Sequence, residues 1–243
     1  MNLIIDIGNS RTKYAIFEHS EEIHFESSTI PEIPKIRKLK IDFQSISQTI
    51  ISATGNVSED FIRYCQSIFP KVLVFSYKTQ LPFRFEYKTP ATIGLDRLAG
   101  IAGAQKLFPD KNVLIIDVGT AITFDVKNSN NIFRGGNISP GMMMRFKALN
   151  KFTDKLPLVT PNEKTSFLGD STNQAIANGV INGIIYEIEG MIAETEKKYN
   201  DLTVILTGGD TSFFDNKLKK TIFVFQNLIN IGLDIILNYN AGI

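Results

Sequence analysis

Apolar runs that end in polar turns dominate the start of the chain. Residues 3–5 are all apolar, Asp6 and Gly8 follow, and a second strand-like segment, Lys-Tyr-Ala-Ile-Phe, follows at 13–17. An uninterrupted short apolar run fits a fully buried strand, whereas alternation fits a strand with one buried face. The pattern therefore predicts a β-hairpin with a buried first strand.

The same hairpin pattern occurs a second time near the middle of the chain. Leu-Ile-Ile-Asp-Ile-Gly at 3–8 recurs as Leu-Ile-Ile-Asp-Val-Gly at 114–119, and an alternating segment follows at 122–126. A repeat of roughly 20 to 50 residues would indicate a solenoid, whereas one distant repetition favours two duplicated α/β lobes. Chance similarity is the alternative, because buried strands use few residue types. The predicted lobes are residues 1–110 and 111–243.

Further elements are predicted between and after the two hairpins. Apolar patterns indicate strands at 23–27, 49–53, 72–76 and 202–206. Helical spacing indicates helices at 58–69, 94–108, 171–199 and 226–238, the first of them capped by Ser58. The third helix contains Gly179, Gly183 and Gly190. Each weakens a helix by roughly 1 kcal/mol relative to alanine, so we expect them to permit close packing.

Composition narrows the class of protein. The 243 residues contain 26 Lys and Arg against 25 Asp and Glu, and this balance argues against a nucleic-acid or anionic-lipid partner. The single cysteine, Cys65, has apolar neighbours at helical spacing and is expected in the core. No run of about 18 apolar residues and no signal-peptide pattern occurs, so a cytoplasmic protein without a membrane partner is expected.

The first hairpin tip has the chemistry of a phosphate loop. A glycine there lets backbone N–H groups turn toward an anion, Asn9, Ser10 and Thr12 add donors, and Lys13 adds positive charge. The Asp6 carboxylate suits the hydrated Mg²⁺ that accompanies a nucleotide. These features favour Mg-ATP over free phosphate, although an ordinary Asn/Gly turn remains the alternative.

Two further glycine turns add to this prediction. Residues 117–121 repeat the Asp-x-Gly elements, and Thr-Gly-Gly-Asp at 207–210 lies between a strand and a helix, where a base or ribose can approach the bare backbone.

No Walker A, G-x-G-x-x-G, G-x-S-x-G or H-E-x-x-H pattern occurs. P-loop, dinucleotide-binding and common hydrolase interpretations therefore lose their sequence support.

Several motifs in order carry a resemblance to a known family. They are D-x-G-N-S at 6–10, Tyr87 and Pro90 before G-x-D-R at 94–97, D-x-G-T-A at 117–121, Gly-Gly-Asn-Ile-Ser-Pro-Gly-Met at 135–142, Gly-Asp-Ser-Thr at 169–172, and Thr-Gly-Gly-Asp at 207–210. With these the chain resembles the type III pantothenate kinases of the acetate and sugar kinase/Hsp70/actin superfamily. Ser10 stands where that family usually has threonine, which keeps the hydroxyl.

The resemblance implies a fold and an activity. The fold would be α/β, with two duplicated ribonuclease H-like lobes, as in actin-like ATPases, and a nucleotide cleft between them. The activity would be ATP-dependent phosphorylation of pantothenate, the first step of coenzyme A synthesis, in a homodimer whose long helices pair. The alternative is an ATP-binding regulatory or accessory protein of the same fold without kinase activity. A polymerising ATPase or a nuclease finds less support in the short chain and its balanced charge.

Residue roles follow from the same resemblance. Asp96 would accept the proton of the substrate hydroxyl, and Asp117 would hold a monovalent cation, K⁺ or ammonium, while Mg²⁺ arrives with ATP. ATP would contact Asp6, Ile7, Gly8, Asn9, Ser10, Arg11, Thr12, Lys13 and Thr120. Pantothenate would contact Tyr87, Gly94, Leu95, Asp96, Arg97 and Thr172.

The roles of Asp96 and Arg97 have a physical alternative. A carboxylate at a helix start is favoured by the helix dipole, and an arginine beside it can bind a substrate carboxylate. By themselves, however, Asp96 and Arg97 also fit an ordinary first-turn aspartate and a solvated arginine.

Overall fold

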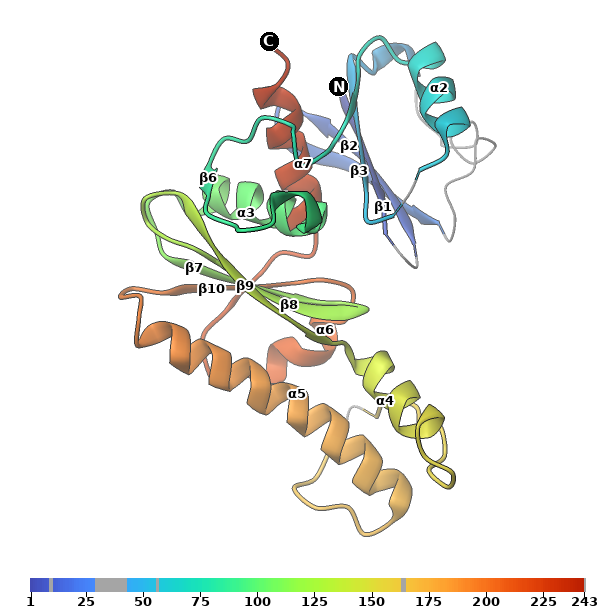
Figure 1. Ribbon diagram of the computed structural model, residues 1–243, viewed down its shortest axis with the longest axis vertical. Helices are drawn as coiled ribbons and strands as arrows, with labels where there is room; N and C mark the ends of the chain where they lie inside the picture. The colour runs from blue at the N-terminus through green and yellow to red at the C-terminus, as the bar shows by residue number, and fades with distance from the viewer. Residues whose placement is uncertain (9–10, 29–42, 56, 163–164, 243) are drawn as a thin grey trace. The chain divides into compact units, whose positions relative to one another are not determined.

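The computed structural model describes residues 1–8, 11–28, 43–55, 57–162 and 165–242 (Figure 1). Contacts divide the chain into two compact units. The first unit comprises Met1–Pro109 with Asn227–Ile243, and the second comprises Asp110–Gln226. Each unit consists of a β-sheet and its helices. The expected ATP contacts Asn9 and Ser10 lie outside the described part of the chain.

The sheet of the first unit has the order β3-β2-β1-β4-β5 among the described strands. Its strands are β1 (Asn2–Ile7), β2 (Thr12–Glu18), β3 (Glu21–Ser28), β4 (Gln48–Ala53) and β5 (Val72–Val74). β1 pairs antiparallel with β2 and parallel with β4. This confirms the predicted hairpin, and the burial of β1 from Leu3 to Ile7 confirms its buried first strand.

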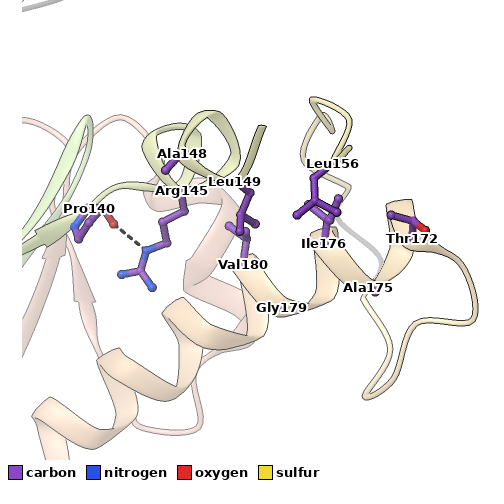
Figure 2. A pocket seen from close by; sticks show the side chains of 10 residues that line it. All are labelled: Pro140, Arg145, Ala148, Leu149, Leu156, Thr172, Ala175, Ile176, Gly179 and Val180. Atoms are coloured by element: carbon purple, nitrogen blue, oxygen red, sulfur yellow. Dashed lines mark hydrogen bonds between the residues drawn. The ribbon is translucent and has the colours of Figure 1, made fainter. Parts of the chain in front are cut away.

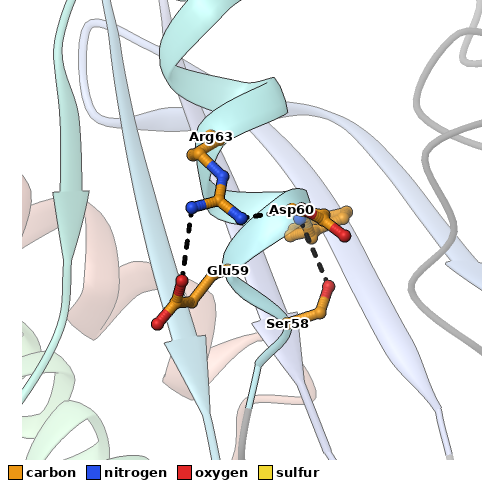
Figure 3. Close-up of polar contacts among 5 residues, drawn as sticks. Ser58, Glu59, Asp60 and Arg63 are labelled. Carbon is orange, nitrogen blue, oxygen red and sulfur yellow. Dashed lines mark hydrogen bonds and ion pairs between the residues drawn. The ribbon is translucent and has the colours of Figure 1, made fainter.

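One face of this sheet packs against α2 (Glu59–Ile68). Leu3 and Ile5 of β1 form a core there with Phe61 and Cys65 of the helix. The Ser58 side chain caps the helix by accepting a hydrogen bond from the Phe61 N–H, as predicted, and this cap is drawn in Figure 3. Burial raises the pKa of the Cys65 thiol to about 12, as expected for a core residue.

Helices α3 (Leu95–Leu107) and α7 (Leu228–Tyr239) pack against each other and against the other face of the sheet. Alternation along β1 directs Asn2 to this face, where its Nδ2 donates to Asp234 Oδ1 of α7 at 2.7 Å. The helices approach closely because of glycine: a Cβ on Gly232 would lie 1.8 Å from the carbonyl oxygen of Ala99.

The C-terminal segment packs differently from the sequence-based division at residue 110. We expected residues 227–243 in the second lobe, but contacts assign them to the first unit, with α7 against α3, β1 and β4. The helix buries Leu228, Leu233, Ile236 and Leu237 in that position. A chain that crosses back to its first unit leaves no local pattern that marks the crossing.

The second unit repeats the topology of the first. Its strands run β11-β10-β7-β8-β9, with the bounds β7 (Val113–Val118), β8 (Ala121–Lys127), β9 (Ile132–Pro140), β10 (Thr203–Thr207) and β11 (Phe223–Val224). β7 pairs antiparallel with β8 and parallel with β10, just as β1 pairs with β2 and β4. The repeated sequence therefore marks a duplicated fold.

The long helix α5 (Thr172–Glu196) covers one face of this second sheet (Figure 1). Its residues Ile181, Ile184 and Ile188 form a core with Leu114 and Ile116 of β7. The shorter helix α4 (Met142–Lys151) precedes it. The remaining short elements are η1 (Phe43–Ser45), β6 (Arg84–Phe85), η2 (Pro90–Thr92), α6 (Thr211–Phe214) and η3 (Asp215–Lys217).

One expectation about α5 is wrong within this chain. A Cβ on Gly179, Gly183 or Gly190 would meet no atom within 4 Å, so these glycines permit no close packing here. They lie on the open side of the helix, away from its buried isoleucines.

No helix in the described part of the chain combines the length and apolar character needed to cross a bilayer.

Candidate functional site

Asp6 stands near the end of β1, where three neighbours surround its carboxylate. Lys13, its register partner on β2, places Nζ 3.8 Å from Asp6 Oδ2. Ser52, its register partner on β4, hydrogen-bonds the carboxylate. Burial raises the pKa of Asp6, Lys13 lowers it, and the negative charge of Asp96 raises it again. Ionised Asp6 therefore depends on positive or hydrogen-bonding partners.

A backbone hydrogen bond joins Gly8 and Arg11 in the segment after Asp6. The Gly8 N–H donates to the Arg11 carbonyl at 2.9 Å, and Ile7 ends the strand before it. Thr12 is fully buried, and no partner of its hydroxyl is found among the described residues. Arg11 is exposed and Lys13 half-buried. Asn9 and Ser10, two of the expected phosphate contacts, lie outside the described ranges.

Asp96 lies in the first turn of α3, with Gly94 as the N-cap residue and Leu95 between them. Its Oδ1 accepts a hydrogen bond from the Arg97 N–H at 2.8 Å. The electrostatic interaction with Asp6 shows that the two carboxylates share one region of the first unit. The expected proton acceptor and the aspartate of the expected phosphate loop are therefore near enough for their charges to interact.

Arg97 is not a solvated side chain. It is only 6% exposed, and its guanidinium Cζ lies 5.9 Å from the centre of the Tyr87 ring, a cation–π arrangement. A buried guanidinium is rare without a function or a partner. Two residues expected to contact the substrate, Tyr87 and Arg97, are therefore adjacent.

In the second unit, Asp117 lies one residue before the end of β7 and is level with Thr207 of β10. Gly208 has a φ of +102°, and a Cβ there would lie 2.4 Å from Asp117 Oδ1, so only glycine fits this turn. Thr207 is fully buried, and its hydroxyl has no partner in the part of the chain that the structure describes.

Thr120 lies in the turn after β7 and is held by the start of α4. The Gly141 N–H donates to the Thr120 carbonyl at 3.1 Å. A Cβ on Gly141 would lie 2.4 Å from the same oxygen, so this contact also needs a glycine. The Asp117 and Thr120 turn and the glycine turn at 207–210 therefore form one cluster in this unit.

Thr172, the first residue of α5, lines a cavity of about 740 Å³ between α4 and α5. Figure 2 shows the side chains that line it, most of them apolar, with Arg145 Nε donating to the Pro140 carbonyl at 2.8 Å. Of the described residues expected to contact ligands, Thr172 alone lines this cavity.

The second-unit cluster contains oxygen donors that could hold a cation. It offers two carboxylates, Asp117 and Asp210, and the Thr207 hydroxyl, which has no partner among the described residues. Oxygen donors of this kind suit hard cations. No group of three or more His, Cys, Asp or Glu side chains in the described ranges could hold a metal ion. Mg²⁺ is expected to arrive with the nucleotide.

Sequence reasoning missed Ser52, and it named the turn at 207–210 without giving the Thr207 hydroxyl a role. Both are hydroxyl residues on the strand that runs parallel to an Asp-x-Gly strand, at the position level with the aspartate. The two segments are similar, Ile-Ile-Ser-Ala at 50–53 and Ile-Leu-Thr-Gly at 205–208. That second repetition was the available signal.

Comparison with known proteins places the chain in a family. The family model described as type III pantothenate kinase matches residues 2–194. A type III pantothenate kinase of Christiangramia forsetii is 40% identical, and one of Phocaeicola vulgatus is 42% identical, each alignment covering 99% of both chains.

Solved structures with low identity share the fold. A Campylobacter jejuni protein assigned to the Baf family of transcriptional activators has a TM-score of 0.68 at 21% identity, covering 99% of this chain and 100% of that one. A glucokinase from an Antarctic psychrotroph has a TM-score of 0.51 at 10% identity, covering 98% and 99%. The fold is thus the two-lobed ribonuclease H-like fold of actin-like ATPases and sugar kinases, and the chain belongs to the type III pantothenate kinase family.

Proposed function

We propose that this protein transfers the γ-phosphoryl group of ATP to the primary hydroxyl of pantothenate, the first step of coenzyme A biosynthesis. Family membership along nearly the whole chain supports this activity. The observation that supports the mechanism is that the charges of Asp96 and Asp6 interact within the first unit, which relates a candidate base to a candidate phosphate loop.

Asp96 acts as the proton acceptor in this proposal. Phosphoryl transfer needs mainly alignment and charge neutralisation, with one base within reach of the attacking hydroxyl. The hydroxyl oxygen attacks the γ-phosphorus, the bond to the β–γ bridging oxygen breaks, and the proton passes to Asp96. Asp96 lies in the first turn of α3 and is partly exposed, so a substrate hydroxyl can reach it.

Arg97 and Tyr87 hold the substrate. The buried guanidinium binds the pantothenate carboxylate, and the Tyr87 ring fixes the guanidinium from one side. The backbone of Gly94 and Leu95 contacts the same substrate at the start of α3. Thr172 contacts it from the start of α5.

ATP is held by both repeated loops. Its phosphates contact the first loop at Asp6, Ile7, Gly8, Asn9, Ser10, Arg11, Thr12 and Lys13, and the second loop at Thr120. Mg²⁺ accompanies the nucleotide and neutralises phosphate charge. Asp117 holds K⁺ or ammonium, and the buried Thr207 hydroxyl supports that assignment.

The protein acts as a cytoplasmic homodimer in this proposal. On α5, a Cβ added to Gly179 or Gly183 would meet no atom within 4 Å, and Tyr186 is exposed. Small residues on a helix face allow a second helix to approach closely. Light scattering of the purified protein tests the dimer, and a monomeric mass would contradict it.

A coupled assay of the purified chain tests the activity. We expect ADP to form only when both ATP and pantothenate are present, and to form faster in potassium than in sodium. Nucleotide binding without pantothenate-dependent turnover would instead favour the regulatory or accessory alternative. Family membership gives that alternative no support.

A further inference from the structure

Ser52 lies level with Asp6 on the neighbouring parallel strand. The register of β1 and β4 pairs the two residues directly, and paired residues of parallel strands project to the same face. Ser52 is 1% exposed and Asp6 is 6% exposed. The Ser52 side chain hydrogen-bonds the Asp6 carboxylate in this buried position.

A buried hydroxyl does not by itself indicate function, and β4 contains the comparison. Thr49, on the same strand, is also fully buried, and its hydroxyl has no partner among the described residues. Thr49 pairs with Leu3 at the other end of β1. Ser52 differs because its hydroxyl donates to a carboxylate that also interacts with Lys13 and Asp96.

The second unit has a hydroxyl at the equivalent position. Thr207 is level with Asp117 on the parallel strand β10, as Ser52 is level with Asp6 on β4. The duplicated fold thus duplicates the aspartate and the hydroxyl beside it. The Thr207 hydroxyl has no partner among the described residues, so the two units share the position of the hydroxyl, whereas the hydrogen bond to the carboxylate is particular to Ser52.

We propose that Ser52 is a positioning residue, whose hydroxyl fixes the Asp6 carboxylate in the orientation that receives MgATP. The inference rests on the proposed function, because it takes Asp6 as part of the ATP site. When one oxygen of a buried carboxylate is held by a hydrogen bond, the other oxygen keeps a fixed direction toward the ligand. In Asp6 that other oxygen is Oδ1, which has no partner among the described residues. Without the Ser52 hydroxyl the carboxylate can rotate away.

Calorimetric titration with the Mg²⁺ complex of β,γ-imido-ATP tests the proposal in the full chain. We expect Ser52→Ala to bind about 10-fold more weakly, the scale of a hydrogen bond to a charged group. The KM for MgATP should rise similarly, while the KM for pantothenate stays unchanged. Ser52→Thr, which keeps the hydroxyl, should recover binding, and the matched control Thr49→Val should bind like the unmodified protein.

A double-variant cycle keeps the test decisive even where a threonine methyl group does not fit at position 52. If Ser52 acts through Asp6, Ser52→Ala should cause no further loss of binding in an Asp6→Asn background. Equal binding by Ser52→Ala and the unmodified protein, or the full additional loss in the Asp6→Asn background, would overturn the proposal. If the unmodified protein binds the analogue but does not phosphorylate pantothenate, the proposed function fails while the binding results still decide the role of Ser52.

Discussion

The carboxylate of Asp96 occupies the space that a side chain on Gly94 would need. A Cβ on Gly94 would lie 2.5 Å from Asp96 Oδ1. Gly94 has a φ of −61°, which any residue can adopt, so its backbone does not require glycine. The glycine in the G-x-D-R motif therefore serves to leave room for the carboxylate beside it.

Gly94→Ala should turn the Asp96 carboxylate and slow catalysis. A misplacement of this size costs up to about 100-fold in rate, and we expect kcat to fall by roughly 10- to 100-fold. The KM for MgATP should stay close to normal. Steady-state kinetics measure both, with Gly55→Ala as the control, because a Cβ on Gly55 meets no atom within 4 Å. An unchanged kcat in Gly94→Ala would show that Asp96 tolerates the crowding.

Asp96→Asn should remove the proton acceptor. We expect kcat to fall by about 100- to 10,000-fold, the usual contribution of a general base, while binding of the MgATP analogue persists. Asp60 gives a matched control, because it is also a first-turn aspartate, paired with Arg63 on the surface of α2 (Figure 3). Asp60→Asn should keep full activity. If both variants kept it, Asp96 would be an ordinary first-turn aspartate.

Asp117→Asn should abolish the stimulation by potassium. Thr207→Val, which replaces the hydroxyl with a methyl group of similar size, should raise the potassium concentration needed for half-maximal stimulation. Thermal melting in potassium and in sodium gives an independent measure, because a bound ion stabilises the folded state. If both variants and the unmodified protein responded identically to potassium, the cation would not bind at this cluster.

Gly232→Ala should push helices α3 and α7 apart. The new Cβ would lie 1.8 Å from the Ala99 carbonyl oxygen, and backbone cannot move aside as a flexible side chain can. We expect the free energy of unfolding to fall by roughly 1–3 kcal/mol or more, as for other overpacked sites. Urea denaturation measures the change. Unchanged stability would mean that α3 and α7 pack less tightly than the structure indicates.

Asp234 should make stability depend on pH. Burial raises the pKa of this carboxyl above 3.8, although hydrogen bonds from Asn2 and Asn238 lower it. The folded state therefore holds the proton more tightly than the unfolded state, and the contribution of Asp234 to stability falls as the pH rises from 3.8 through the raised folded value. Asp234→Asn should flatten that part of the curve of unfolding free energy against pH. The same slope in the variant would assign the dependence to other groups.

The sequence alone was enough for the local elements and for the family. The hairpins, the buried first strands, the Ser58 cap and the core position of Cys65 follow from patterns within a few residues, and the structure confirms them. The repeated Asp-x-Gly runs correctly indicated a duplicated fold, because both copies keep the same short-range pattern. The ordered motifs indicated the type III pantothenate kinase family, which the comparisons then showed.

Only the tertiary structure decided which distant residues meet. Parallel pairing brings Ser52 to Asp6 and Thr207 to Asp117, and no local pattern specifies the register of strands joined by long crossovers. Likewise, burial of Arg97 depends on how the segment around Tyr87 folds over it, and the place of α7 depends on the close contact between Gly232 and Ala99. Local periodicity sets the elements of this chain, whereas its long-range contacts assemble the candidate site.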